Sequence, residues 1–417
     1  MTDSRTLHPH TRLLHAGQPG FNNEGNAPVN APIVRTSTVR FSSVAQMDAL
    51  KTRRQAGEQV SLYGRHGTDT HRALEAALCS LEGANHAWLA PSGVAAITLG
   101  LLSLVAPGEH VLITDSVYDP VPHRIVSTLF ARFGIEASYF DPLTQPIEEH
   151  LRPNTRVVYA ESPGSILFEV LDIPALARAA HAHGALLMVD NTWAAGYLQA
   201  PMDLGADLVA CALTKYQGGH SDLMQGALLA RDDALARRVL STYEALGYAV
   251  SADDASLVLR GMRTLPVRMA QHGRNVIEVA NWLLAHPQVE RVYCPGLPSD
   301  PGHALWKRDF SGHNGLLSVQ FKDFSGLQLN AFSDALQLHS IGASWGGYES
   351  LALPVTDKAL SSHQGWQRAQ KQREQAGLAP SAGVVRLHVG LEDVGDLTAD
   401  IAQAIEQAVN QPRARQP

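Results

Sequence analysis

The chain has 417 residues, of which 45% are apolar and 18% are charged, the composition of a globular protein long enough for two or three domains. The formal net charge is −7 and the basic residues are scattered, so we do not expect a nucleic-acid partner. The N-terminus has no apolar core of a signal peptide and the longest apolar stretch is too short to span a bilayer, so we expect a cytoplasmic protein with no membrane contact.

Residues 1–67 are rich in Pro, Asn, Arg and Gly and show little periodicity, which predicts an N-terminal arm lying on its own subunit or on a neighbour. From residue 68 to 262, helical and strand patterns alternate, which predicts an α/β domain with a mostly parallel sheet covered on both faces. The strands are expected at 86–90, 110–114, 135–140, 156–161, 185–190, 207–213 and 226–230. The helices between them are expected at 70–81, 94–105 and 173–183.

The pattern changes after about residue 260. Two long helical segments, 267–286 and 397–409, bracket short strands such as 315–321 and 384–389. This order predicts a smaller α+β domain, residues 263–417.

Two of the apolar runs end in polar residues that a core would not select. Asp190 follows the run 185–189, and Thr214 and Lys215 follow the run 208–213. Because ligands of open α/β sheets bind beyond the carboxyl ends of the strands, both charges are expected in one crevice. A lysine can carry pyridoxal phosphate as a Schiff base while a carboxylate keeps the pyridine nitrogen protonated. On these residues alone, a buried ion pair that only fixes register is an equal alternative.

Two further segments suit anions. The Pro91–Gly93 turn joins a predicted strand to a predicted helix, so the free N–H groups of the helix N-terminus are available to a phosphate. Arg386 lies on a short apolar strand, where a guanidinium recognises a planar anion or forms a surface salt bridge.

Other chemistries have less support. Residues 342–346 match the G-x-S-x-G nucleophile elbow, and Asp357 and His388 nominally complete a triad, but the residues that follow Gly346 are a poor helix start. The chain has 19 histidines but no HExxH motif, and its three cysteines lack metal-ligand spacing, so no metal site is predicted. Neither a G-x-G-x-x-G nor a Walker A sequence supports a nucleotide-dependent enzyme.

Several ordered stretches together resemble one family. They are YGRHGTDTH, PSGVAAI, ESPGSILFEV, DNTWAAG, TKYQGGHSD, SWGGYES and RLHVGLED. From about Tyr63 to Val394 the chain resembles the Cys/Met-metabolism (trans-sulfuration) family of fold-type I pyridoxal phosphate enzymes. The resemblance implies a PLP-dependent transferase-like α/β fold with a mostly parallel seven-stranded sheet, a smaller C-terminal α+β domain and the N-terminal arm.

The resemblance also implies roles for individual residues. Lys215 would carry the cofactor and act as base, Asp190 would pair with the pyridinium, and Tyr118 would stack on the ring and assist proton transfer. The phosphate would bind to Ser92, Gly93, Val94 and Thr214, with Tyr63 and Arg65 contributed by a neighbouring subunit of a dimer of dimers. The substrate would contact Arg386, Ser344 and Trp345, the first two through its α-carboxylate.

Within the family, Trp193 in DNTWAAG and Trp345 in SWGGYES are similar to the β-eliminating members, and Ser165 stands where γ-type members often have Asn. Ala343 departs from the Tyr that precedes the serine in some β-lyases. The resemblance thus implies a carbon–sulfur β-lyase of methionine biosynthesis that cleaves L-cystathionine to homocysteine, pyruvate and ammonia, with activity on cystine and related thioethers. A γ-lyase, a γ-synthase or a methionine γ-lyase on the same scaffold is the alternative, and a serine hydrolase or a non-enzymatic pyridoxal-binding regulator is a distant one.

Overall fold

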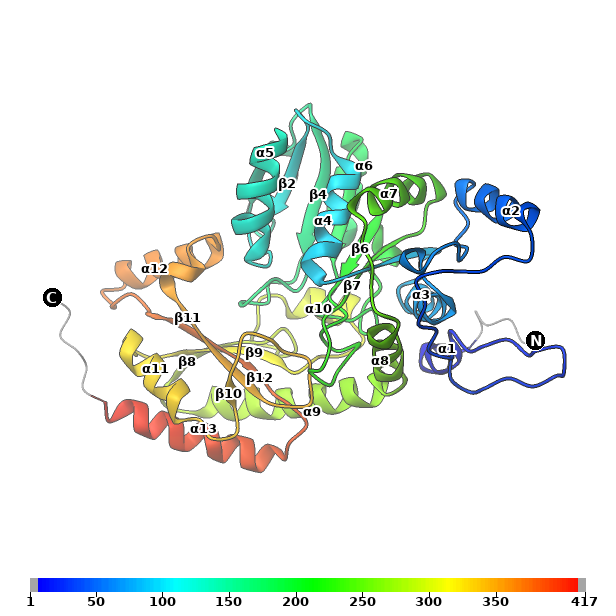
Figure 1. Cartoon of the computed structure of the whole chain (residues 1–417). Coiled ribbons are helices and arrows are strands. Elements are labelled where there is room, and N and C mark those ends of the chain that lie inside the picture. Colours follow the sequence, from blue (N-terminus) through cyan, green and yellow to red (C-terminus); the bar gives the residue numbers. More distant parts are fainter. Residues whose placement is uncertain (1–6, 412–417) are drawn as a thin grey trace.

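A computed structural model describes residues 7–411 and contains two β-sheets (Figure 1). The larger sheet has seven strands in the order β1-β7-β6-β5-β4-β2-β3. Its strands are β1 (His86–Ala90), β2 (His110–Thr114), β3 (Glu136–Phe140), β4 (Thr155–Glu161), β5 (Leu186–Asp190), β6 (Leu208–Cys211) and β7 (Gly226–Ala230). All neighbouring pairs are parallel except those of β7, which runs antiparallel to β1 and to β6. The predicted mostly parallel α/β sheet is confirmed.

Both faces of the large sheet are covered, as its continuous apolar strands require. In β4, Val157 and Tyr159 pack into one hydrophobic cluster while Val158 and Ala160 pack into the cluster on the opposite face. One face is covered by α4 (Gly93–Leu104), by the helical segment Val121–Phe130 that continues into α5 (Ala131–Phe133), and by α7 (Asp233–Leu246). The other face is covered by α3 (Asp69–Glu82), α6 (Ile173–His183) and α8 (Ala252–Arg263).

Helix α6 shows how local sequence sets these elements. The Asp172 side chain accepts a hydrogen bond from the backbone N–H of Ala175 at 3.0 Å, and Pro174 lies in the first turn, where its missing N–H costs nothing. Gly184 ends the helix with a φ of 81°, a conformation that a side chain disfavours. The predicted helix 173–183 therefore has the bounds that its caps indicate.

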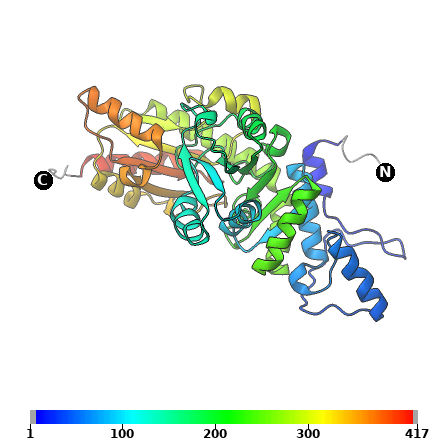
Figure 2. The same cartoon turned by 90° about the horizontal axis from the view of Figure 1, so that it is seen from above.

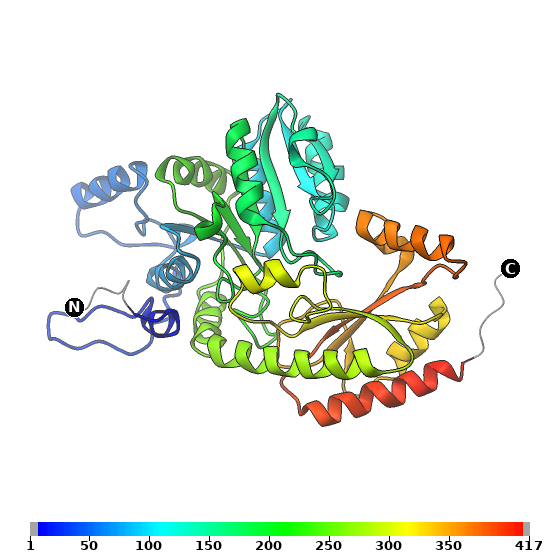
Figure 3. The same ribbon diagram turned by 180° about the vertical axis from the view of Figure 1, so that it is seen from behind.

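The smaller sheet has five strands in the order β10-β11-β12-β9-β8 and is largely antiparallel. Its strands are β8 (Val289–Tyr293), β9 (Leu316–Phe321), β10 (Ser340–Ile341), β11 (Leu351–Thr356) and β12 (Gly383–His388). The long helices α9 (Leu265–Ala285) and α13 (Val394–Val409) run along this sheet, and α11 (Gly326–Ala335) shares their hydrophobic cluster (Figure 3). The remaining helices of this half are α10 (His303–Asp309) and α12 (Gln364–Gln375).

The N-terminal region and the C-terminal helices lie at opposite ends of the molecule (Figure 2). Although residues 1–67 show little periodicity in sequence, they contain two helices, α1 (Pro9–His15) and α2 (Val44–Gln55). Ser43 caps α2 by accepting from the N–H of Gln46. The side chain of Arg54 is buried, and its Nη2 lies 2.6 Å from Oε1 of Glu244 on α7. Helix α2 is charged and lacks an apolar stripe, so this ion pair holds it against α7. The proposed domain divisions after residues 67 and 262 stay a prediction.

Candidate active site

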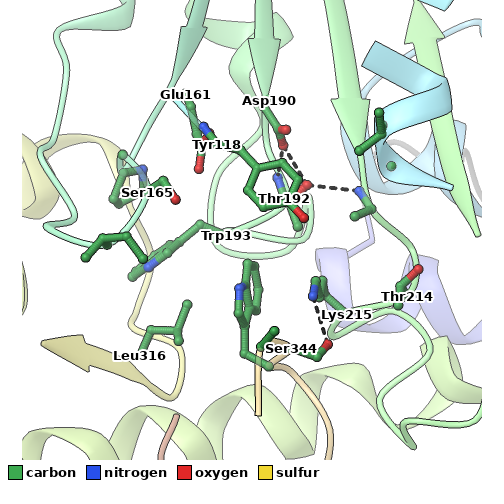
Figure 4. Close-up of a pocket in the computed structure, with 18 of the residues that line it drawn as sticks. Tyr118, Glu161, Ser165, Asp190, Thr192, Trp193, Thr214, Lys215, Leu316 and Ser344 are labelled. Carbon is green, nitrogen blue, oxygen red and sulfur yellow. Dashed lines mark hydrogen bonds between the residues drawn. The ribbon is translucent and has the colours of Figure 1, made fainter. Parts of the chain in front are cut away.

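A pocket lies where the carboxyl ends of β4, β5 and β6 face β12 of the small sheet (Figure 4). The large-sheet side supplies Ser92, Gly93, Val94, Tyr118, Glu161, Ser165, Asp190, Thr192, Trp193, Thr214 and Lys215. The small-sheet side supplies Leu316, Ala343, Ser344, Trp345 and Arg386. The crevice predicted from the two strand ends is therefore present, and all but two of the predicted site residues line it.

Asp190 is the last residue of β5 and is buried. Its Oδ1 accepts hydrogen bonds from the N–H of Thr192 at 2.9 Å and from the Thr192 hydroxyl at 2.5 Å, and its Oδ2 lies 3.5 Å from the hydroxyl of Tyr159. Burial raises the pKa of Asp190, although the hydrogen bonds from Thr192 oppose that effect. The carboxyl group is thus oriented by its neighbours and costly to leave charged without a cationic partner.

Lys215 follows β6 in a turn, four residues beyond the last strand residue rather than two beyond the predicted one. Its Nζ donates to the Ser344 hydroxyl at 2.8 Å and lies 5.0 Å from the centre of the Trp345 ring. Burial and the nearby charge of Arg386 lower the pKa of Lys215 to about 8. A substantial fraction of this amine is therefore neutral near physiological pH and able to accept a proton.

The small-sheet wall is organised by Arg386 on β12. Its Nη2 donates to the carbonyl oxygens of Ala343 and Ser344, at 2.9 and 3.1 Å. Burial lowers the pKa of Arg386 to about 10, so the guanidinium stays charged at neutral pH. One arginine thus fixes the segment that brings Ser344 and Trp345 to Lys215.

The structure does not assemble the hydrolase triad. His388 uses its two ring nitrogens on the N–H of Gly346 and the carbonyl of Glu349, and Asp357 accepts from the indole of Trp366. The partner of the Ser344 hydroxyl is Lys215. Within residues 7–411, no group of three or more His, Cys, Asp or Glu side chains is placed to hold a metal ion.

Comparisons with known proteins agree with this geometry. Residues 10–406 match the family described as "Cys/Met metabolism PLP-dependent enzyme". The chain belongs to this family. It is 49% identical to the cystathionine beta-lyase of Bordetella avium over 98% of this chain and 100% of that protein, and 40% identical to that of Escherichia coli over 94% and 96%. It also resembles the crystal structure of metB from Corynebacterium glutamicum, with a TM-score of 0.84 and 30% identity over 97% and 99% of the two chains.

Membership of the family makes the chain a pyridoxal phosphate enzyme, and the pocket residues fit that cofactor. The first turn of α4 leaves N–H groups without intrahelical acceptors, as a phosphate requires. A Cβ at position 93 would lie only 2.6 Å from the Cβ of Ala212. Glycine, which has no Cβ, is therefore the residue that fits at this position. Asp190 and Lys215 line the same pocket, where the pyridine nitrogen and the aldehyde of the cofactor need an acid and an amine.

Tyr63 and Arg65 are the predicted site residues that are not in this pocket. Arg65 lines a separate depression near the short helical turn Gly64–His66, and Tyr63 is exposed. Their predicted role is in a neighbouring subunit, which a single chain does not test.

Glu161 is a pocket residue that the sequence analysis did not single out. It ends β4 beside Asp190 of β5, and its Oε2 accepts from the backbone N–H of Tyr118 at 2.6 Å. Burial and the neighbouring charge of Asp190 raise its pKa well above the ordinary value. The signal was present, since a polar residue at the end of an apolar run is the same pattern that identified Asp190.

Proposed function

We propose that this enzyme is a carbon–sulfur β-lyase that cleaves L-cystathionine to homocysteine, pyruvate and ammonia, and that it also accepts cystine and related thioethers. The observation that carries the proposal is the Lys215 amine, which lies between Ser344 and Trp345 with a lowered pKa and shares its pocket with Asp190 and Arg386. The similarity to the β-lyase relatives covers nearly the whole chain and is not confined to one of its two sheets.

Substrate binding is assigned to the small-sheet wall. Nη2 of Arg386 donates to the carbonyls of Ala343 and Ser344, and the other N–H groups of the guanidinium, on Nη1 and Nε, are the donors for the substrate α-carboxylate. The Ser344 hydroxyl adds a donor beside it. These contacts fix the amino-acid end of any substrate with Cα facing Lys215.

Proton transfer is assigned to Lys215. Bound pyridoxal phosphate supplies an electron sink for the electrons that remain at Cα when its proton leaves, and Asp190 holds the proton of the ring nitrogen that makes this sink effective. The neutral Lys215 amine accepts the Cα proton, and the Cβ–S bond breaks with its electron pair going to sulfur as thiolate. Protonation of the thiolate releases homocysteine, and hydrolysis of the three-carbon remainder gives pyruvate and ammonia. Tyr118 lines the pocket, and its backbone N–H donates to the carboxyl group of Glu161. We assign its ring to stacking on the cofactor ring.

The alternative is γ-elimination, which needs a second proton to be removed from Cβ. We choose β-elimination because Trp193 and Trp345 are similar to the residues of the β-eliminating members. Trp193 is buried in an edge-on contact with Phe310, and Trp345 faces Lys215. Ser165, in place of the Asn frequent in γ-type members, lines the same pocket.

Purified enzyme incubated with L-cystathionine tests the reaction. Pyruvate with homocysteine is expected, whereas 2-oxobutyrate with cysteine would mean γ-elimination and overturn the choice. Borohydride should fix the cofactor covalently to Lys215 in either case, so the cofactor and the reaction are tested separately.

Assembly follows from the arm. Tyr63 and Arg65 lie outside the pocket of their own chain, which supports our proposal that they reach the cofactor phosphate of a neighbouring subunit in a cytoplasmic dimer of dimers. Mixing Arg65→Ala with Lys215→Ala subunits should then restore activity, because a hybrid dimer contains one intact site. If the protein sediments as a monomer and that monomer is fully active, the proposal is contradicted.

No helix of the described residues is long and apolar enough to cross a membrane.

A further inference from the structure

Strand β12 presents two polar side chains to the same segment of chain. Arg386 and His388 are two residues apart and therefore point to one face of the sheet, while Val385 and Leu387 enter the hydrophobic cluster on the other face. Both polar side chains bind residues 342–349, which we call the serine loop. Arg386 binds the carbonyls of Ala343 and Ser344, as described above, and His388 binds further along the loop.

The partners of His388 fix its proton. Its Nε2 lies 3.1 Å from the backbone nitrogen of Gly346, whose N–H can only donate, so Nε2 must carry a free lone pair. Its Nδ1 lies 2.9 Å from the carbonyl oxygen of Glu349, which can only accept, so Nδ1 must carry the hydrogen. Both contacts are satisfied only by the neutral Nδ1–H form of the ring.

The surroundings of His388 maintain that form. The ring is fully buried, and the titratable groups that influence it are His272 on α9, Arg386 on its own strand and His339 ahead of β10. The ring of Tyr216 also lies against it, 5.8 Å away between centres. Burial, His272 and Arg386 hold the pKa of His388 well below its usual range.

Gly346 connects His388 to Lys215. Its φ is 90°, and a Cβ there would lie 2.9 Å from the backbone nitrogen of Tyr216 and 3.0 Å from the Cα of Lys215. The serine loop therefore rests directly on the backbone that carries Lys215. Ser344 and Trp345, the two residues before Gly346, are the ones that contact the Lys215 amine.

We propose that His388 is a positioning residue that holds the serine loop against Lys215 by accepting the Gly346 N–H, and so sets the hydrogen-bond acceptor and the aromatic face that the lysine nitrogen experiences. The inference rests on the proposed function for its kinetic consequence, but its structural consequence requires only the bound cofactor. Arg386 holds the start of the serine loop and His388 holds its middle. The loss of His388 should therefore change the surroundings of the Lys215 amine more than it changes the binding of the substrate α-carboxylate by Arg386.

Two amide substitutions separate the two bonds of His388. The shorter side chain of His388→Asn retains a donor near the position of Nδ1 but offers no acceptor to Gly346, whereas His388→Gln carries an acceptor out to about the position of Nε2. The holoenzymes are titrated with pH while the visible absorption band of the cofactor bound to Lys215 is recorded. For His388→Asn we expect the midpoint pH to fall by about one unit, because the lysine nitrogen loses partners that favour its protonated form. We expect His388→Gln to stay within about a third of a unit of wild type.

Kinetic measurements add a second test, because we expect kcat and KM to change by different amounts, which a general loss of folding would not produce. In His388→Asn, kcat for pyruvate release should fall about tenfold or more while KM changes less than about threefold, because the Arg386 guanidinium remains to bind the substrate α-carboxylate. His272→Asn is the matched control: His272 is equally buried beside His388, its Nδ1 donates to the carbonyl of Val389 at 3.0 Å, and its Nε2 has no partner among residues 7–411. It should leave both readouts unchanged.

The proposal is overturned if His388→Asn keeps the wild-type midpoint and kcat, or if His272→Asn shifts them equally. Should His388→Asn fail to fold, His388→Gln decides, since a shifted midpoint in that variant would show that the Gly346 acceptor is not what matters. The titration uses no substrate, so a wild-type enzyme inactive on cystathionine would contradict the proposed function and leave this test intact.

Discussion

At the carboxyl edge of the large sheet, removal from water raises the pKa values of Glu161 and Asp190, whereas Asp400 on α13, as buried as Asp190, has a pKa below its usual range. The difference lies in their partners. Burial also acts to raise the pKa of Asp400, but His339 and three backbone N–H groups outweigh it, with distances of 2.7 to 3.2 Å. Asp190 has the two donors of Thr192 and a long contact to Tyr159.

The comparison separates two uses of a buried charge. The carboxylate of Asp400 is satisfied within the chain and stabilises the fold, since its ionised form is favoured in the folded state. The carboxylates at the large-sheet edge are incompletely satisfied and destabilise the chain until a cationic group arrives, which is the property expected of a cofactor site. Substitutions at the two places should therefore have opposite signatures, activity lost at one and stability lost at the other.

The largest expected effect is that of Lys215→Ala. The change removes both the amine that carries the cofactor and the proposed base, so we expect turnover to fall on the order of 10³-fold or more. The exposed Lys307 on α10 gives the matched control, Lys307→Ala, which should keep wild-type activity. Pyruvate release and borohydride labelling measure the two functions. Appreciable turnover in Lys215→Ala would refute its role as base.

Asp190→Asn should come next. The amide has the shape of the carboxylate but does not stabilise a proton on the cofactor ring, so we expect roughly a 10²-fold loss in kcat. Because the carboxylate is costly to bury, the same change should not lower the free energy of unfolding of the cofactor-free protein. Urea unfolding beside the kinetics checks both parts, and a destabilised variant with normal turnover would make Asp190 a structural residue.

The two sides of the pocket also differ in how far sequence predicts them. Asp190 and Lys215 were predicted because a charged residue at, or just after, the carboxyl end of a strand in such a sheet lies at a known edge of the sheet. Glu161 follows the same rule and was overlooked. The antiparallel β7 between β1 and β6 was not predictable, since a buried apolar strand carries no mark of its direction.

On the small-sheet side, Arg386 was recognised as a charge on an apolar strand, but its partners were not. The serine loop reaches Arg386 and His388 across about forty residues of sequence, and no local pattern encodes such a pairing. The G-x-S-x-G match at 342–346 even indicated a different chemistry until the partners of Ser344 and His388 were known. Helix α2 was missed for a related reason, because its burial depends on the ion pair of Arg54 with a distant helix.

Arg386→Lys tests the small-sheet wall with a smaller effect. Lysine keeps the charge but not the planar set of N–H donors, so KM should rise about tenfold for every amino-acid substrate while kcat changes little. The measurement compares L-cystathionine with L-cystine. A rise in KM for only one of them would mean that Arg386 contacts the distal part of the substrate instead of the shared α-carboxylate.

The smallest effect on activity, and the clearest on stability, is expected for Asp400→Asn. Asp400 accepts five hydrogen bonds, from three backbone N–H groups, His339 and Gln403. The amide of Asn can accept fewer of them, and its NH2 group would face other donors, so we expect the free energy of unfolding to fall by about 2 kcal/mol at pH 7 with kcat unchanged. Because the folded-state pKa of Asp400 lies below its value in the unfolded chain, its contribution is present above about pH 4 and is lost as the pH falls through the folded-state value. The gap between wild type and Asp400→Asn in urea unfolding should therefore be constant from pH 7 to 5 and narrow below that. A gap that widens on acidification, or a variant that loses turnover without losing stability, would remove the distinction between the two buried carboxylates.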